Sequence, residues 1–381
     1  MAANTAARHV VLQGARRVPR GRKGVTRTSL SDALQGGAAG WDGLLAGAQI
    51  ASPFMSWAWH RAWADSAPTA DVQASEVVQL HGADGSLHAF LPVRLGRERF
   101  RRIPVRAVSW AIGDTGCPDE LDVPSLPEAD LQAFAEGIED IPWQIIVLGN
   151  LAQDAQNVQR LREALEERGH TTRHRPLWSC PRLELPASWD AYLGTLSPNR
   201  RQILRRKARA LHRDHAVALV DYDQKTLDAG WGHLLALHAQ RWNGTGGAFR
   251  DPRTARLHRQ FAAAMARTQR LWLSTLNLDG HPVAAWYGFT SADTVYFYQG
   301  GRDPQWQRES VGLVLMSLMI QRAIERGYRV FNFLRGEDEY KSAWKPAQRM
   351  TGEMVVFRSG WRGRGLRLLD AIAARRGGAV R

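Results

Sequence analysis

Three neighbouring stretches in the C-terminal half decide the fold: TVYFYQGG (294–301), SVGLVLMSLMIQRAIERG (310–327) and RVFNFLRG (329–336). The first and third are short aromatic and β-branched runs, which predict buried strands. The middle stretch is apolar on nearly every side and ends at a glycine, which predicts a helix buried between layers. Together they predict a unit of the α/β type, in which a helix connects two strands.

The same order of elements occurs twice in the chain. LWLSTLNL (271–278) and PVAAWYGFT (282–290) flank Asp279-Gly280 and predict a hairpin before the three stretches above. In the first half, EVVQL (76–80) and LHAFLPVRL (87–95) predict a hairpin. They are followed by AVSWAI (107–112), LQAFAEGIED (131–140) and WQIIVLGN (143–150), which predict a strand, a helix and a strand. We infer an internal duplication in an α/β (α+β) protein; a single continuous domain is the alternative.

The net charge of +14 is concentrated in three segments. Residues 1–28 and 358–381 carry +7 and +6, and residues 199–213 carry another +7 without an acidic residue. The rest of the chain is therefore mildly acidic, at −6. Basic termini are typical of solvated tails or of segments that bind an anionic partner. We expect basic tails at 1–45 and 358–381, the first of them disordered.

The third basic segment, LSPNRRQILRRKARALHRDH (196–215), reads as a helix. Ser197 is suited to the N-cap, Pro198 to the first helical position, and Leu204 and Leu211 to one apolar face. The seven basic residues from Arg200 to Arg213 cover the remaining surface and repel one another. Either this is a solvated face, or a polyanion or acidic surface relieves the repulsion.

Composition excludes several classes of protein. Cys117 and Cys180 provide neither a disulfide framework nor a metal cluster, and the twelve histidines have no zinc-like arrangement. No apolar run reaches the roughly 18 residues of a membrane span. A secretory signal requires an apolar stretch after its basic residues, and none follows Arg16-Arg17. We therefore expect a cytoplasmic protein without a metal.

The two halves differ most between the third strand and the following helix. In the first half, GDTGCPDELDVPSLPEAD (113–130) has six carboxylates and no basic residue, so it would repel phosphate. In the second half, GGRDPQWQRESVG (300–312) places glycines at the strand end and the helix start. A helix amino terminus offers unpaired N–H groups, and glycine admits a close ligand. The candidate cofactor-binding residues are Gly300, Gly301, Arg302, Arg308, Ser310, Val311, Gly312 and Leu313.

This arrangement resembles the cofactor half of the GNAT acyltransferases, which use acetyl-CoA. HAQRWNGTGGAF (238–249), NLDGHPVAAWYGF (277–289), YQGGRDP (298–304) and FLRGEDEYKSAW (333–344), with the helix at 310–327, resemble more narrowly the CelD-type acetyltransferases associated with cellulose synthesis. Those are related to the Fem-type aminoacyltransferases, which carry two tandem GNAT units.

The resemblance covers roughly residues 50–357 and implies a domain plan. It implies tandem GNAT-like units, each a mixed, largely antiparallel sheet flanked by helices. The first would span 46–180 without binding cofactor, and the second 181–357 with acetyl-CoA or another acyl-CoA as co-substrate. In that family the last strand usually begins with Asp, where this chain has Asn332.

Acyl transfer needs a base for the acceptor's proton and an acid for the leaving thiolate. Glu337 is the candidate base and Tyr340 the candidate acid. The carboxylates at 338 and 339 would favour protonation of Glu337, and Lys341 would oppose it. His238 is a second candidate base. The alternative is a solvated acidic turn, with Tyr340 packed in the core.

The candidate substrate-binding residues are Arg241, Trp242, Phe249 and Trp344. The first three flank or end the glycine-rich NGTGGAF (243–249), which suits a lid over an acceptor. An ordinary connection between elements is the alternative.

The function predicted from the sequence is acyl-CoA-dependent N- or O-acyl transfer, foremost acetyl transfer. The acceptor would be a small molecule or a saccharide, in exopolysaccharide or cell-envelope synthesis. One alternative is Fem-type transfer from aminoacyl-tRNA, which the Arg200–Arg213 helix motivates. Another is a non-catalytic protein whose basic tails adhere to an anionic membrane or polysaccharide.

Overall fold

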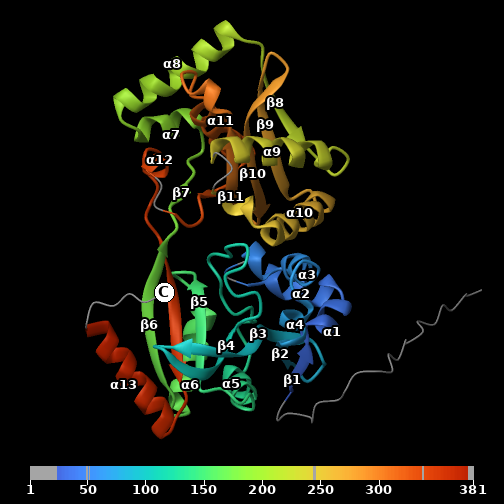
Figure 1. Cartoon of the computed structure of the whole chain (residues 1–381), viewed down its shortest axis with the longest axis vertical. Helices are drawn as coiled ribbons and strands as arrows, with labels where there is room; N and C mark the ends of the chain where they lie inside the picture. The colour runs from blue at the N-terminus through green and yellow to red at the C-terminus, as the bar shows by residue number, and fades with distance from the viewer. Residues whose placement is uncertain (1–23, 49, 51, 243–245, 337–338, 376–381) are drawn as a thin grey trace, which may run out of the picture.

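The protein forms two mixed sheets, each flanked by helices (Figure 1). The computed structural model describes residues 24–48, 50, 52–242, 246–336 and 339–375. In the first half these residues form β1 (Val25–Ser29), α1 (Leu30–Gln35), α2 (Ala38–Ala46), η1 (Pro53–Met55), α3 (Trp57–Ala64), α4 (Thr69–Gln73), β2 (Ser75–His81), β3 (Leu87–Phe100), β4 (Ile103–Trp110), α5 (Leu131–Glu139), β5 (Ile145–Leu151), α6 (Gln156–Glu167) and β6 (Thr171–Ser179).

The second half repeats much of this order. Its elements are β7 (Arg182–Glu184), α7 (Trp189–Thr195), α8 (Pro198–Asp214), β8 (Val217–Tyr222), α9 (Leu227–Arg241), η2 (Ala248–Arg250), α10 (Pro252–Arg267), β9 (Leu271–Leu278), β10 (His281–Ser291), β11 (Thr294–Arg302), η3 (Pro304–Trp306), α11 (Val311–Glu325), β12 (Val330–Asn332), α12 (Glu339–Ser342), β13 (Met350–Phe357) and α13 (Trp361–Arg375).

Strand pairing confirms the repeated order predicted from the sequence. The first sheet has the order β1-β2-β3-β4-β5-β13-β6, and the second β7-β12-β11-β10-β9-β8. In both sheets a hairpin, β2–β3 or β9–β10, pairs antiparallel with the next strand. That strand then pairs parallel with the one beyond the helix, β4 with β5 and β11 with β12. Parallel neighbours need a crossover, which α5 and α11 provide.

The boundary between the halves differs from the predicted one at the C-terminal end. The chain crosses between the sheets from β6 to β7, near the predicted boundary at residue 180. However, β13 does not belong to the second unit, because it returns to the first sheet and lies between β5 and β6. A strand's partners are set by tertiary pairing and not by its place in the sequence. The prediction of a second unit continuous over 181–357 is therefore wrong.

The predicted N-terminal tail is wrong for its described residues. Residues 25–46 form β1, α1 and α2, and Leu30, Leu34 and Trp41 are buried. Ser29 caps α1, since its hydroxyl oxygen accepts a hydrogen bond from the Asp32 N–H at 3.0 Å. The prediction rested on the basic charges and did not consider the apolar side chains that pack over the first sheet. Residues 1–23 lie outside the described part of the chain.

The predicted basic C-terminal tail is instead the helix α13, which packs on the first sheet. Leu366 is buried in a small cluster with Val105 and Phe357. Asp370 is 1% exposed and pairs with Arg101 at 2.9 Å and Arg173 at 2.5 Å. A buried carboxylate between two guanidinium groups holds the helix on the sheet. Arginine density in this segment therefore does not mark a solvated tail.

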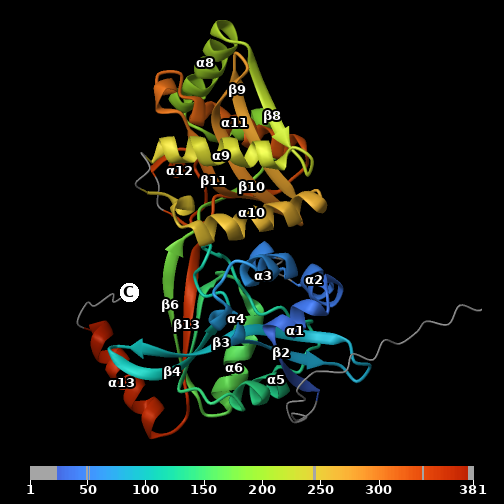
Figure 2. The same cartoon turned by 45° about the vertical axis from the view of Figure 1, so that its right-hand side comes forward.

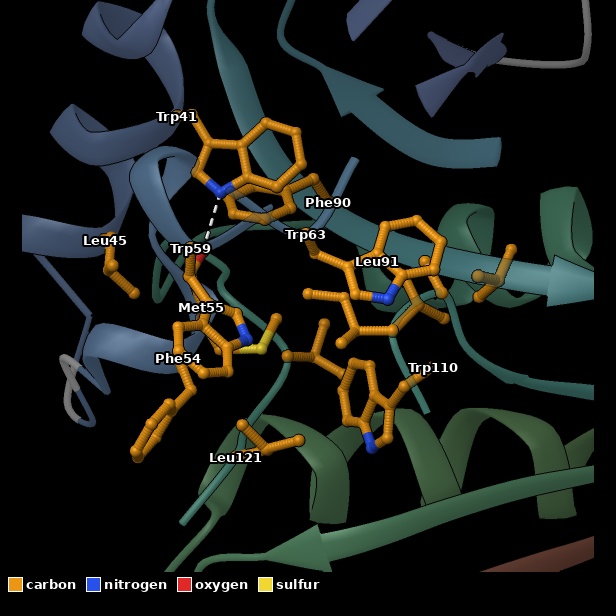
Figure 3. Close-up of a cluster of buried hydrophobic side chains, with 14 of the residues drawn as sticks. Trp41, Leu45, Phe54, Met55, Trp59, Trp63, Phe90, Leu91, Trp110 and Leu121 are labelled. Carbon is orange, nitrogen blue, oxygen red and sulfur yellow. Dashed lines mark hydrogen bonds between the residues drawn. The ribbon is translucent and has the colours of Figure 1, made fainter. Parts of the chain in front are cut away.

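An aromatic core fills the first half and continues into the second. Trp41, Phe54, Trp59 and Phe90 lie together, and the Trp41 indole N–H donates to the Met55 carbonyl oxygen at 2.7 Å (Figure 3). Trp59 also packs edge-on against Phe261 of α10, with ring centroids 4.9 Å apart. The two halves thus share one hydrophobic core. Among the described helices, none is both long enough and apolar enough to cross a bilayer.

Candidate active site

The site is formed where β11 and β12 separate. These strands pair only from Thr294 with Val330 to Tyr296 with Asn332, although β11 continues to Arg302. Leu334, just beyond β12, has φ of 55°, and the chain turns away from β11 there. The separation leaves an opening between the end of β11 and residues 340–344.

A cavity of about 450 Å³ occupies this opening. Seven of the predicted cofactor-binding residues line it: Gly300, Gly301, Arg302, Ser310, Val311, Gly312 and Leu313. Tyr340, Arg241 and Trp344, predicted for catalysis or acceptor binding, also line it. Arg308 does not: its side chain is exposed, and its carbonyl oxygen accepts a hydrogen bond from Lys207 of α8.

The amino terminus of α11 faces the cavity with unpaired N–H groups. Ser310 lies in the left-handed region, with φ of 61°, and its side chain makes no capping hydrogen bond. Within the described residues, the N–H groups of Val311 and Gly312 have no hydrogen-bond partner. Together with the helix dipole, these N–H groups favour an anion at this end of the cavity.

Three arginines from separate elements line the same cavity. Arg200 begins α8 and lies 4.9 Å from the Trp344 ring centroid. Arg241 ends α9 and donates to the Gly300 carbonyl oxygen at 3.2 Å. Arg302 ends β11. No described residue that lines the cavity carries a carboxylate, so the charged side chains of its lining are all positive.

Gly301, near the end of β11, is required by packing. A Cβ on Gly301 would lie 2.4 Å from the His238 nitrogen and 2.5 Å from the Leu237 carbonyl carbon. Gly301 is therefore needed because α9 crosses the strand at this point. Gly312 is different, since a Cβ there would make only an ordinary contact of 3.5 Å with Arg302 Cδ.

The predicted catalytic residues are distributed unevenly around the cavity. Tyr340 lines it, whereas Glu337 lies outside the described residues. Lys341 is buried beneath the turn, and its Nζ donates to the Arg335 carbonyl oxygen at 2.8 Å. Its ammonium group therefore holds the turn that follows β12 and does not line the cavity.

His238 also lies outside the cavity lining. It is buried, and burial with a smaller effect of Arg241 lowers its pKa to about 4. An imidazole with so low a pKa is neutral at pH 7 but is a weak proton acceptor. Phe249 packs on it at 4.9 Å, and exposed Trp242 lies 5.1 Å from the Arg241 guanidinium. Neither Phe249 nor Trp242 lines the cavity, and residues 243–245 of the expected lid lie outside the described part of the chain.

Sequence reasoning missed several lining residues. Trp286 and Phe297 stack with centroids 5.4 Å apart and form an apolar wall beneath α11. Alternation along β10 and β11 could have placed both on the α11 face. Arg200 was assigned to the charged face of its helix without distinction from its neighbours. Its place in the cavity lining and its contact with the Trp344 ring set it apart, and partial burial lowers its pKa.

Three of the six carboxylates of the first-half loop, those of Asp119, Glu120 and Asp122, are buried and face inward. Asp119 is fully buried and binds Arg335, with Nε 2.6 Å and the backbone N–H 2.9 Å from its oxygens. Glu120 accepts a hydrogen bond from the Asn332 amide. Asp122 accepts the N–H of Val158 at 2.8 Å, at the start of α6. These groups fix the end of β12 and cap a helix.

The Asn332–Glu120 contact explains why an amide suits this position. Asn332 donates to Glu120 and accepts the Leu334 N–H at 2.8 Å, and both side chains are buried. An ionised Asp at 332 could accept but not donate, and it would face a second carboxylate.

Comparisons with known proteins agree with this geometry. The family described as "Acetyltransferase (GNAT) domain" matches residues 198–342, from α8 to α12, which include nearly all of the cavity wall. The match lies within the second half of the chain. No curated protein matches the chain. Within the described residues no group of His, Cys, Asp or Glu could hold a metal ion.

Solved structures resemble most of the chain and not just the residues that match the GNAT domain. FemX is 11% identical with a TM-score of 0.58, and the match covers 87% of this chain and 98% of FemX. A domain of a putative lysylphosphatidylglycerol synthetase from Agrobacterium fabrum is 13% identical with a TM-score of 0.54, over 91% of this chain and 97% of that one. A protein of unknown function from Bacteroides thetaiotaomicron is 12% identical with a TM-score of 0.55, over 84% and 98%. At these identities the likeness establishes the fold alone.

Proposed function

We propose that the second half is an acyl-CoA-dependent N- or O-acyltransferase, with acetyl-CoA as the first candidate donor. The observation that carries this proposal is the cavity at the start of α11. It combines two unpaired N–H groups, three arginines and an apolar wall in the half that matches a GNAT domain.

Each part of the cavity fits a part of such a donor. The N–H groups of Val311 and Gly312, with Arg302, would hold phosphate oxygens. The wall of Trp286 and Phe297 would contact the apolar arm that carries the thioester. Arg200 and Arg241 would add positive charge at the two remaining sides.

The protein's part in the reaction is to accept one proton and to donate another. The acceptor's amine or hydroxyl attacks the thioester carbonyl carbon, its proton passes to a base, and the thiolate that leaves takes a proton. Tyr340 lines the cavity and is the proposed proton donor to the thiolate. Glu337 remains the proposed base. Arg241 would orient the Tyr340 ring, since its guanidinium lies 5.8 Å from the ring centroid.

The proposed acceptor is a small molecule or a saccharide of the exopolysaccharide or cell-envelope class. The support is the resemblance of residues 238–344 to CelD-type acetyltransferases. Mass-spectrometric screening of amines, sugars and oligosaccharides with acetyl-CoA would identify the acceptor.

Calorimetry with CoA tests the donor. The wild type should bind CoA, and Gly312→Asp should bind at least about 100-fold more weakly, because a carboxylate would face the phosphates. Gly312→Asn is the matched control, since it adds the same bulk without charge and should lose much less. Failure of the wild type to bind, or equal affinities for Asp and Asn, would overturn the proposal.

Transfer from aminoacyl-tRNA is the second candidate, and the position of α8 favours it. Arg200 of this helix lines the cavity, and Arg205, Arg206 and Arg209 are exposed further along it. A phosphate backbone could therefore follow α8 to the cavity. This reading predicts that tRNA affinity falls steeply between about 50 and 200 mM salt. Arg205→Glu/Arg209→Glu should abolish that binding while CoA affinity changes little.

A further inference from the structure

The helix α13 has an apolar stripe on the side that faces away from the protein. Gly363, Leu366 and Asp370 form its buried face. Trp361, Leu368 and Ile372 lie on the opposite side at helical spacing, with 75%, 62% and 38% of their surface exposed. Leu369, 40% exposed, widens the stripe. Exposed apolar residues grouped in this way mark an interaction surface.

Arginines flank this stripe on both sides. Arg362, Arg364, Arg367 and Arg375 are all exposed. Within the described residues, none of these four makes an ion pair. The helix has one acidic residue, Asp370, and its buried pairs with Arg101 and Arg173 keep it off the outward face. The outward face is therefore both apolar and purely cationic.

The turn between β3 and β4 lies next to α13. The Arg101–Asp370 pair fixes this turn against α13, and Figure 2 shows the two side by side. Ile103 is 37% exposed there, and Arg99 and Arg102 are exposed. The turn thus adds an apolar side chain and two further cations beside the stripe.

We propose that α13 and the β3–β4 turn bind the surface of an anionic lipid bilayer. The helix would lie in the plane of the interface, with Trp361, Leu368 and Ile372 among the upper acyl chains. Its arginines would contact the phosphates of the headgroups. The inner face of the helix stays on the first sheet, so no unfolding is required.

The observations favour a bilayer over other occupants. A second copy of this face would bring arginines against arginines, which repel. A nucleic acid would satisfy the arginines but leave Leu368 and Ile372 in water. A bilayer with anionic lipids takes up both the charge and the apolar stripe.

The proposed membrane surface lies far from the acyl-transfer cavity. In Figures 1 and 2, α13 is at the opposite end of the molecule from α8 and α11. The cavity would therefore remain accessible while α13 is bound, and the protein could act on an acceptor near the bilayer. The membrane proposal does not depend on which acyl donor the cavity takes.

Co-sedimentation of the full chain with lipid vesicles tests the proposal. Vesicles of phosphatidylcholine with phosphatidylglycerol should bind the wild type, and pure phosphatidylcholine vesicles should not. Leu368→Glu/Ile372→Glu should weaken binding by about 100-fold, because both charges would enter the apolar layer. Arg205→Glu/Arg209→Glu on α8 is the control for net charge, and it should bind nearly as the wild type although it lowers the net charge twice as much as Leu368→Glu/Ile372→Glu does.

Three results would overturn the proposal. One is unchanged sedimentation of Leu368→Glu/Ile372→Glu, since binding would then not use the stripe. Another is loss of binding in the α8 control alone. The third is a wild type that does not bind vesicles and instead forms dimers, which Leu368→Glu/Ile372→Glu disrupts. A second copy of the protein would then cover the face. Thermal unfolding and CoA calorimetry of each variant show that the fold is intact.

Discussion

The two junctions between a third strand and its following helix have the same place in the fold and opposite uses. In the first half, residues 111–130 fold back into the sheet, where Leu121 bridges to Leu151. The Asp130 carboxylate caps α5 by accepting the Ala133 N–H at 3.0 Å. In the second half the junction is shorter, since it comprises only residues 303–310, and the start of α11 faces a cavity.

This difference leaves the first junction filled by its own side chains and the second one open to a cavity. A carboxylate at the start of α5 occupies the position where an anion would otherwise bind. The same loop then reaches across to the second half through Asp119 and Glu120. The first half therefore contributes to the site by holding the end of β12.

The largest expected effect comes from breaking that link. Arg335→Met leaves the Asp119 carboxylate buried without its cation, which should lower the free energy of unfolding by about 3–5 kcal/mol. Chemical denaturation measures this change in the free energy of unfolding. Arg349→Met removes an exposed ion pair with Asp154 and is the control, with a cost of at most about 1 kcal/mol. Asp119→Asn added to Arg335→Met should recover part of the loss; no recovery would mean that the buried charge is not the cause.

A smaller effect depends on pH at Glu120. Burial, opposed by Arg182 and the Asn332 hydrogen bond, raises its pKa from 4.5 to about 7. Between these values the unfolded chain has lost the proton that the folded protein keeps, so stability falls as pH rises through this window. Glu120→Gln should match the wild type near pH 4 and exceed it by about 2 kcal/mol at pH 8.

Denaturation at several pH values would measure this difference. Glu163→Gln, at a side chain 56% exposed, is the control and should show no such trend. A Glu120→Gln difference that stays constant from pH 4 to pH 8 would contradict the raised pKa.

The smallest effects compare the two helix starts directly. Asp130→Ala removes a cap and should cost about 1 kcal/mol. Ser310→Gly removes no capping bond and relieves a left-handed conformation, so it should stabilise the protein by about 0.5 kcal/mol. Ser310→Ala should be near neutral. A clear loss in Ser310→Gly would show that the serine hydroxyl has a role that the structure does not reveal.

Much of the fold followed from local patterns. Alternation and apolar runs located both hairpins, both parallel strand pairs and the helices between them. The predicted residues Gly300, Gly301, Ser310, Val311 and Gly312 line the cavity at the start of α11. The strand exchange by β13 and the packing of α13 were missed, because both depend on contacts between residues far apart in the chain. Charge counting also missed β1, α1 and α2 within residues 25–46, for the same reason.

The sequence by itself determined two repeated units, a basic helix between them and a glycine-bearing helix start with no acidic cap. These are local properties, since period, capping and charge are read within a few turns of chain. Only the tertiary structure decided that the acidic loop turns inward to Arg335 and Asn332, and that Lys341 and His238 lie outside the cavity. It also decided that α13 turns its apolar stripe outward. Burial and pairing over long sequence distances set these features, and no local pattern records them.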